Sequence, residues 1–359
     1  MNAKIVLLPG DGIGPEVTRE AELLIKTVAE AHGVRLDMHT ALIGGAAIDA
    51  TGDPLPEATL TACRAAGAVV LGAVGGPKWS DPAAKVRPEQ GLLKIRKELG
   101  LFANLRPVRL HPQLLAASPL KPEYLQGVDL MVVRELTGGS YFGEKVEGDD
   151  FASDTCTYSR VEIERVVRMA GNIARQRTGR LTMIDKANVM ATSRLWRKVT
   201  KEVMQAEFHD LSCEYILVDA AAMYLISNPA RFDVIVTENM FGDILTDEAS
   251  MLAGSMGMLP SASLALGKFG LYEPIHGSAP DIAGQGIANP FGMLASVAMM
   301  FTYSLDMPEA AEQIEQAIAD CISDGLCTRD LGGTLGTSEA GAAVRRKLAG
   351  SRTRRAAND

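Results

Sequence analysis

The sequence predicts an α/β protein of two domains, and three observations support this. The chain has 359 residues, which is long for a single hydrophobic core. Residues 4–31 read as a strand, a glycine turn and an amphipathic helix in succession. Several later apolar runs end in ionisable side chains, as do the buried strands that carry the sites of α/β proteins.

Composition narrows the classes of partner. The formal net charge of -8 argues against nucleic acid or an anionic membrane as a bulk partner. The sequence shows no apolar run of about 18 residues that suggests a membrane span and no leader-like start. The five cysteines are an odd number and form no C-x-x-C pair. We therefore expect reduced thiols and a cytoplasmic location.

The first strand, turn and helix do not match a Rossmann fingerprint. The strand is expected at Lys4–Pro9 and the helix from Glu16 to about Ala31, with an apolar stripe facing the core. The turn between them reads G-x-G-x-G, and Pro15 stands where the third glycine of G-x-G-x-x-G is required. We therefore expect a βα unit of another kind.

Ionisable residues follow several of the expected strands. Arg134 and Glu135 end one, Asp185 and Lys186 another, and Asp219 and Glu238 follow two more. Any one of them alone reads more readily as part of a structural salt bridge. Several together favour a site at the carboxyl ends of the strands.

Residues 239–252 are expected to form a helix that follows a strand at 232–237, with Asn239 as a candidate cap. Asp243 and Asp247 are four residues apart, so their carboxylates share one helix face and repel each other. A positive charge is therefore expected between them. Paired oxygen ligands suit Mg²⁺ or Mn²⁺, whereas the alternative is a solvated acidic face.

Two segments rich in glycine complete the candidate site. Residues 138–148 are turn-rich and are expected to form an arm or hairpin, in which Tyr141 is either an acid or an exposed ring. Residues 271–290 contain too much glycine and proline for a helix or a central strand. This long loop is either functional or a surface Ω-loop. In the functional interpretation backbone N–H groups near Gly277 cradle phosphates and Asp281 binds a ribose diol, while His276 stacks on adenine or caps the loop.

These segments together resemble the β-decarboxylating hydroxyacid dehydrogenases, the isocitrate/isopropylmalate dehydrogenase family. The resemblance covers nearly the whole chain. Its most specific motifs are Val132–Gly139, Asp185–Val189, Asn239–Met251 and Glu273–Gly284.

The resemblance implies a two-domain α/β fold that is not a Rossmann fold, with mixed sheets and helices packed on them. The first domain would comprise residues 1–101 and 254–359 and carry most of the NAD site. The second, residues 102–253, would carry the dimer interface and the arm. The family pattern also implies a homodimer whose active sites are shared between subunits.

The activity implied is NAD-dependent oxidative decarboxylation of 3-isopropylmalate to 2-oxoisocaproate, in leucine biosynthesis, with Mg²⁺ or Mn²⁺. By resemblance Lys186 of the partner subunit takes the hydroxyl proton, and Tyr141 protonates the enolate left by decarboxylation. Asp243 and Asp247 bind the metal together with Asp219 of the partner subunit. The other residues implied in substrate binding are Leu92, Leu93, Arg96, Arg106, Arg134 and Asp219.

The resemblance also suggests which substrate and coenzyme fit. Leu92 and Leu93 would face the isopropyl group, since apolar side chains would leave a third carboxylate of isocitrate unpaired. Asp281 and Ile282 resemble the NAD pattern, because an aspartate repels the 2′-phosphate of NADP. The residues implied in coenzyme binding are Ile13, Gly75, Glu89, Glu273, His276, Gly277, Ser278, Ala279, Asp281, Ile282 and Asn289.

Three departures from the family pattern leave the fine substrate choice open. Ser140 replaces a bulkier residue, residues 144–147 differ and the arm looks short, and alanine follows Asp219. One alternative is the same chemistry on tartrate, malate, methylmalate or homoisocitrate. Another is a non-enzymatic relative, against which the intact set of arginine, lysine, tyrosine and aspartate side chains argues.

Overall fold

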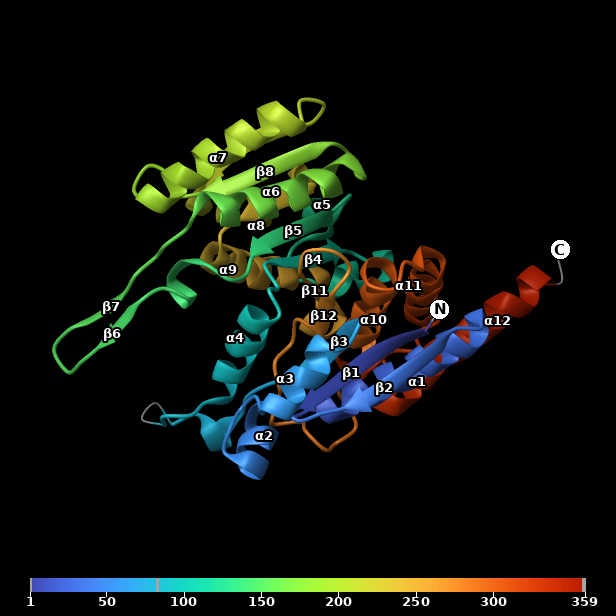
Figure 1. Ribbon diagram of the computed structural model, residues 1–359. Helices are drawn as coiled ribbons and strands as arrows, with labels where there is room; N and C mark the ends of the chain where they lie inside the picture. The colour runs from blue at the N-terminus through green and yellow to red at the C-terminus, as the bar shows by residue number, and fades with distance from the viewer. Residues whose placement is uncertain (1, 82–83, 357–359) are drawn as a thin grey trace. The chain divides into compact units, whose positions relative to one another are not determined.

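The computed structural model describes residues 2–81 and 84–356 of the chain (Figure 1). The chain divides into two compact units. Unit 1 comprises Met1–Leu99 and Ser255–Asp359, and unit 2 comprises Gly100–Gly254. The coenzyme and interface roles expected for the two domains stay predictions.

Unit 1 contains strands in the order β2-β1-β3-β12-β11. β2, β1, β3 and β12 are parallel, and β11 runs antiparallel to β12. Their bounds are β1 Asn2–Gly10, β2 Arg35–Thr40, β3 Ala68–Ala73, β11 Pro260–Leu264 and β12 Gly270–Pro274. β3 is a run of apolar residues buried at every position, as expected for a parallel strand covered on both faces.

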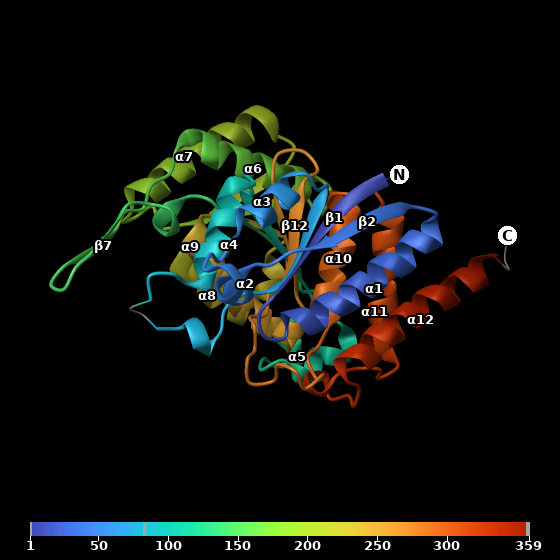
Figure 2. The same ribbon diagram turned by 60° about the horizontal axis from the view of Figure 1, so that its bottom comes forward.

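One helix of unit 1 is almost wholly buried. α10 (Phe291–Tyr303) buries ten residues from Phe291 to Phe301 and packs on β12, β11 and α1. α1 also contacts α12 (Figure 2), where Arg345 pairs with the buried Glu20 at 2.5 Å. The other helices are α1 Gly14–His32, α2 Gly44–Thr51, α3 Glu57–Arg64, α4 Pro88–Glu98, α11 Pro308–Ser323 and α12 Thr337–Ala356.

Unit 2 contains strands in the order β4-β5-β10-β8-β9. β4 and β5 are antiparallel and the other pairs are parallel. Their bounds are β4 Ala103–Arg109, β5 Asp129–Glu135, β8 Arg180–Asp185, β9 Ser212–Leu217 and β10 Val234–Thr237. Mixed sheets with packed helices in both units confirm the predicted fold class.

Helices cover both faces of the strands in unit 2. Ile235 of β10 joins Leu225 and Leu245 of two helices in one buried cluster. Val234 and Val236 point to the opposite face because side chains alternate along a strand, and α6 also packs on β10. The helices are α5 Pro122–Leu125, α6 Arg160–Arg175, α7 Ala191–Glu207, α8 Val218–Ser227 and α9 Asn239–Ser250.

The polar segment after β5 forms a hairpin. β6 (Lys145–Glu147) and β7 (Ala152–Asp154) pair antiparallel, and both views show them extending away from the other elements of unit 2 (Figures 1 and 2). All three residues of β6 are exposed.

The expectation that residues 271–290 hold no central strand is wrong for the first four of them. Residues 271–274 belong to β12, which lies between β3 and β11. Pro274 is tolerated because it is the last residue of the strand, where no further ladder hydrogen bond is needed. Among the described residues, no helix is both long enough and apolar enough to span a membrane.

Candidate active site

The candidate site of unit 2 begins where β10 passes into α9. Glu238 caps α9, because its Oε1 accepts a hydrogen bond from the Phe241 N–H at 2.8 Å. The expectation that Asn239 is the cap is therefore wrong. Asn239 is the first helical residue, and its side chain instead accepts hydrogen bonds from Arg134.

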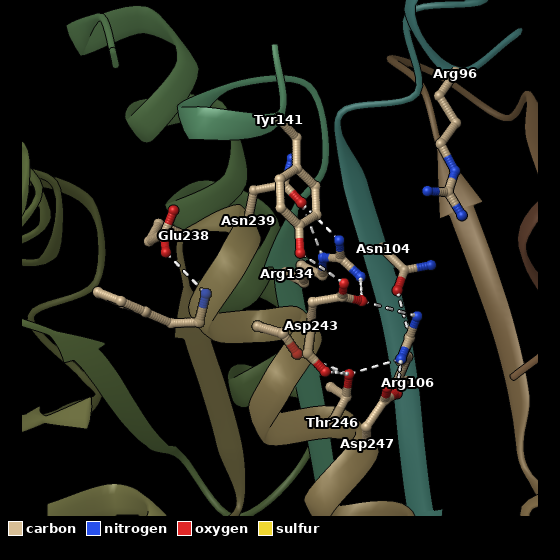
Figure 3. A network of polar contacts seen from close by, with 12 residues as sticks. Arg96, Asn104, Arg106, Arg134, Tyr141, Glu238, Asn239, Asp243, Thr246 and Asp247 are labelled. Carbon is tan, nitrogen blue, oxygen red and sulfur yellow. Dashed lines mark hydrogen bonds and ion pairs between the residues drawn. The ribbon is translucent and has the colours of Figure 1, made fainter. Parts of the chain in front are cut away.

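The positive charge expected between the two aspartates of α9 comes from arginines (Figure 3). Arg106 Nη1 lies 3.2 Å from Asp247 Oδ1, and its Nη2 lies 3.9 Å from Asp243 Oδ1. Arg134 Nη1 donates to the same oxygen of Asp243. Both arginines are buried, at 8% and 2% exposure. Buried guanidinium groups need charged or polar partners, and the aspartates supply them.

Backbone geometry and polar neighbours orient the two arginines. Arg106 stands on β4 beside Asn104, whose Oδ1 accepts from Arg106 Nε at 2.9 Å, and Arg106 Nη1 also donates to Thr246 Oγ1 at 2.7 Å. Arg134 stands on β5 against α9. A Cβ atom at Gly242 would lie 2.6 Å from Arg134 Cγ, so glycine makes room for the arginine there.

Tyr141 is brought to the same aspartate. Its hydroxyl donates to Asp243 Oδ2 at 2.9 Å, and the Arg134 guanidinium lies 5.8 Å from the centre of its ring. Burial, followed by the hydrogen bond to Asp243, raises the pKa of Tyr141 to about 12. The phenol is therefore protonated near neutral pH and able to give up a proton to an acceptor.

Lys186 and Asp219 form a second pair. Lys186 Nζ donates to Asp219 Oδ1 at 2.8 Å. This hydrogen bond is the main reason that the pKa of Asp219 lies below its usual value. The backbone N–H of Lys186 is held by Ser193 Oγ at 3.1 Å. Lys186 therefore stands at the end of β8 beside a carboxylate that keeps a negative charge.

The described residues of one chain do not gather three acidic, histidine or cysteine side chains into a metal-binding set. Asp243 and Asp247 offer carboxylate oxygens from one face of α9, with side-chain exposures of 34% and 60%. An all-oxygen donor set of this kind suits Mg²⁺ or Mn²⁺. A third protein ligand from Asp219 would have to come from a second copy of the chain.

Helix α4 of unit 1 carries the side chains predicted to select the substrate. Pro88 is its first residue, and the Arg87 N–H donates to Gln90 Oε1 at 3.0 Å, as in a capping box. Leu92 and Leu93 are half-buried. Arg96 Nη2 donates to Glu273 Oε1 at 3.0 Å, so two residues expected in substrate and coenzyme binding lie together.

The turn before α1 is hydrogen-bonded to the loop after β12. The Ile13 N–H donates to the Ser278 carbonyl at 2.8 Å. A Cβ atom at Gly12, where φ is +59°, would lie 1.9 Å from that carbonyl oxygen, so only glycine permits the approach. Glu16 Oε1 accepts from the Gly284 N–H at 2.6 Å.

A buried carboxylate joins two further segments of unit 1. Asp11 is 4% exposed and accepts from the N–H groups of Gly45, Ala46 and Gly75, each at 2.8 Å. A Cβ at Gly75 would lie 2.9 Å from Glu89 Oε1, so Glu89 closely approaches this loop. Sequence reasoning overlooked Asp11 and Glu16. An acidic residue inside the glycine turn at 10–14 was the available signal.

The loop expected to bind the coenzyme presents a mixture of engaged and exposed groups. Burial lowers the pKa of His276, so this ring is neutral near pH 7, and its Nδ1 lies 2.9 Å from the Gly277 carbonyl. Asp281 is exposed and Ile282 half-buried. Asn289 is engaged internally, because its Nδ2 donates to Asp330 Oδ2 at 2.9 Å and its Oδ1 accepts from the Phe291 N–H.

Residues 4–344 match a family model described as isocitrate/isopropylmalate dehydrogenase. A 3-isopropylmalate dehydrogenase of Rhodopirellula baltica is 58% identical over 358 residues, which cover 97% of this chain and 100% of that protein. One from Bacillus subtilis is 55% identical, with 92% of each chain covered. Among solved structures, isocitrate dehydrogenase from Methylococcus capsulatus aligns with a TM-score of 0.85 and 34% identity, covering 96% of this chain and 99% of that one.

Proposed function

Because the chain belongs to the isocitrate/isopropylmalate dehydrogenase family, we propose that it oxidises 3-isopropylmalate with NAD and decarboxylates it to 2-oxoisocaproate. This reaction belongs to leucine biosynthesis. Relatives named 3-isopropylmalate dehydrogenase that are 54–58% identical to the chain support the proposal. The observation that carries it is the pair Leu92 and Leu93 on α4, half-buried beside the Arg96 turn. A third carboxylate of isocitrate would be left unpaired against two leucines.

The arginines bind and orient the hydroxy acid. Arg106 and Arg134 are held by Asn104, Thr246 and Asn239, so their guanidinium groups are fixed before the substrate arrives. Planar guanidinium groups match carboxylates with two parallel hydrogen bonds. Carboxylates of the substrate would then compete with Asp243 and Asp247 for these donors. Arg96, which pairs with Glu273 in unit 1, is the third proposed carboxylate partner.

Proton movements use two residues at different steps. Lys186 of the partner subunit must leave its ion pair with Asp219 and lose its own proton before it can act. As the neutral amine it then takes the proton of the substrate hydroxyl as the bond from C2 to hydrogen breaks. The C3 carboxylate then leaves as carbon dioxide. Tyr141, protonated because its pKa is raised to about 12, returns a proton to C3. When bound, NAD supplies the hydride acceptor and a divalent metal the Lewis acid that stabilises developing negative charge.

Asp243, Asp247 and Asp219 of the partner subunit are the proposed metal ligands. Exposed apolar side chains on α8 and α9 support a homodimer that brings the third ligand. Met223 is 69% exposed, Ile226 51% and Ile244 60%. They stand on two helices that contact each other, and an exposed apolar patch on these helices would favour a protein partner. The five cysteines are free, in keeping with the cytoplasmic location that stays a prediction.

The proposed coenzyme residues are those expected from the sequence. The Gly277 N–H and the backbone around Ser278 and Ala279 would contact phosphates, and Asp281 would bind the ribose. The hydrogen bond from the Ile13 N–H to the Ser278 carbonyl supports this assignment. It holds the loop in shape and does not occupy the Gly277 N–H or the Asp281 carboxylate.

Absorbance of the reduced coenzyme, measured with Mg²⁺ and a panel of hydroxy acids, tests the function. The panel contains 3-isopropylmalate, isocitrate, homoisocitrate, tartrate and malate. We expect the highest kcat/KM with 3-isopropylmalate. Higher kcat/KM with another acid would contradict the proposed substrate, and no turnover with any would contradict the proposed activity.

A variant sharpens the substrate assignment. In Leu92→Ser with Leu93→Ser, the polar hydroxyls should reduce kcat/KM for 3-isopropylmalate at least about tenfold, since burying an apolar group of this size contributes about 1–3 kcal/mol. Malate, which lacks the isopropyl group, is the matched control and should lose much less. Equal losses with both acids would remove α4 from the specificity site.

A further inference from the structure

Asn239 is buried between Arg134 and the turn that leads to Tyr141. It is 1% exposed and is the first residue of α9. Its amide oxygen faces Arg134 on β5 (Figure 3), and its amide nitrogen faces the turn that follows that strand. Because capping is done by Glu238, the Asn239 side chain is left for another task.

The amide oxygen fixes the Arg134 guanidinium. Arg134 Nε and Nη2 both donate to Asn239 Oδ1, at 3.0 and 2.7 Å. With Nη1 directed to Asp243, rotation about the terminal bonds of the arginine would break at least one hydrogen bond. Gly242 lies against the aliphatic part of the same side chain. The guanidinium plane is thus set by α9.

The amide nitrogen fixes the turn that leads to Tyr141. Asn239 Nδ2 donates to the Gly138 carbonyl at 3.1 Å, and Tyr141 ends the short 3-10 helix Gly139–Tyr141 that follows. The backbone of Asn239 is held as well, because its N–H donates to the Tyr158 hydroxyl at 2.9 Å. That hydroxyl donates in turn to Glu238 Oε2. The Asn239 side chain therefore connects Arg134, which is proposed to bind a substrate carboxylate, to the turn that carries Tyr141, the proposed proton donor.

We propose that Asn239 is a positioning residue that ties the orientation of Arg134 to the turn carrying Tyr141, and that its neutrality matters for substrate binding. The inference rests on the proposed function of Arg134 and Tyr141. An aspartate has almost the same shape and would orient the guanidinium equally well. It would also place a second carboxylate beside an arginine that already pairs with Asp243, and would lose the donor to Gly138.

The physical consequence concerns the charge that remains for the substrate. A hydrogen bond that an arginine donates to the oxygen of a neutral amide orients the arginine and leaves its net charge in place. A second buried carboxylate beside Arg134 would cancel more of that charge than the pair with Asp243 already does. The amide thus keeps Arg134 attractive to an incoming carboxylate while holding its plane.

Steady-state kinetics of Asn239→Asp test the proposal, with Asn172→Asp as the matched control. Asn172 is exposed on α6, so the control adds the same charge to unit 2 away from any contact with Arg134. We expect Asn239→Asp to raise the KM for the hydroxy acid at least about tenfold, a loss of about 1.4 kcal/mol. The KM for NAD should stay within about twofold, as should both constants of the control.

A double-mutant cycle identifies the route of the effect. In an Arg134→Lys background the lysine cannot receive the same two-point fixing, so Asn239→Asp should change the KM much less than it does with Arg134 present. An unchanged KM for the hydroxy acid in Asn239→Asp would overturn the proposal. An equal rise of both KM values would overturn it too, and so would a full effect in the lysine background.

A substitute variant and a separate assay of the wild type allow the positioning role of Asn239 to be tested in every case. If Asn239→Asp does not fold, Gly242→Ala displaces the Arg134 side chain by a methyl group and should raise the same KM; an unchanged KM would count against the fixing of the guanidinium. Wild-type turnover on the substrate panel decides the proposed function separately. The variants are compared on whichever acid the wild type uses best, so a wrong substrate does not affect the positioning result.

Discussion

The two units of the molecule build their parts of the proposed site in different ways. In unit 1 the expected coenzyme segments are loops joined by backbone groups: Asp11 receives three backbone N–H groups and Glu16 receives a fourth. In unit 2 the expected substrate and metal groups are charged side chains on strands and a helix, paired with one another. Loops need hydrogen bonds from side chains to hold their shape, whereas strands and helices are held by their own backbone hydrogen bonds.

The difference determines what a substitution should do. A carboxylate that satisfies buried backbone N–H groups contributes through the shape of the chain, and its loss leaves those donors unpaired. A carboxylate paired with an arginine near solvent can exchange that partner for a substrate or a metal ion. We therefore expect the unit 2 variants to change catalysis and the unit 1 anchors to change stability and coenzyme affinity.

The largest effect is expected for Asp243→Asn. Asp243 pairs with Arg134 and accepts the Tyr141 hydroxyl, and it is a proposed metal ligand. Removing its charge should lower kcat by at least about 10³-fold even at saturating Mg²⁺. Asp210→Asn, which breaks an exposed pair with Arg175 in the same unit, should leave kcat unchanged. Near-wild-type turnover in Asp243→Asn would remove the metal assignment.

Tyr141→Phe should lower kcat by about 10²–10⁴-fold, the range for a lost general acid. The pKa of Tyr141 is raised to about 12, so the phenol stays protonated as the pH rises through its usual pKa of about 10. The ratio of wild-type to variant kcat should therefore be constant from about pH 7 to about pH 10. A ratio that falls towards one across that range would show a phenol that titrates normally.

Asp281→Lys combined with Ile282→Tyr should shift preference towards NADP. The exposed Asp281 carboxylate would repel a 2′-phosphate, and a lysine would attract it. We expect the ratio of kcat/KM for NAD to that for NADP to fall at least about tenfold. Ile282→Tyr alone serves as the control. An unchanged ratio in the double variant would contradict the ribose assignment of Asp281.

The smallest effect on catalysis is expected for the anchor Asp11→Asn. Its amide oxygen can still accept from the Gly45 and Gly75 N–H groups, but its amide nitrogen then faces the Ala46 N–H and leaves that donor unpaired. Urea denaturation should show a free energy of unfolding lower by about 1–3 kcal/mol, with kcat for the folded enzyme nearly preserved. A stability equal to the wild type would mean that the three hydrogen bonds do not hold the loops.

The sequence predicted the charged side chains of unit 2 better than the carboxylates that hold the loops of unit 1. Arg134, Asp243 and Asp247 follow from a strand end and from helix spacing, which are local patterns, whereas the role of Arg106 came from the family resemblance. The structure brings all four together. The family expected from the motifs is confirmed by the match over residues 4–344. The roles of the individual site residues stay predictions.

What sequence reasoning missed depends on contacts between distant segments. Asp11 meets residues 34 and 64 positions further along the chain, and no local pattern encodes such a meeting. Asn239 was mistaken for a cap because Glu238 competes for that role and has the longer reach. β12 was missed because Pro274 obscured a strand that ends at that residue.

The anchors of unit 1 are thus expected to serve coenzyme binding, and the charged side chains of unit 2 to serve binding of the hydroxy acid. The KM for NAD and the KM for the hydroxy acid, measured in Asp11→Asn and in Arg106→Lys, test this difference directly. Each KM is measured at saturating concentration of the other substrate. Arg106→Lys keeps the charge but loses the planar fork, so it should raise the KM for the hydroxy acid and leave that for NAD unchanged. Asp11→Asn should do the reverse. Equal changes in both constants for either variant would contradict the account.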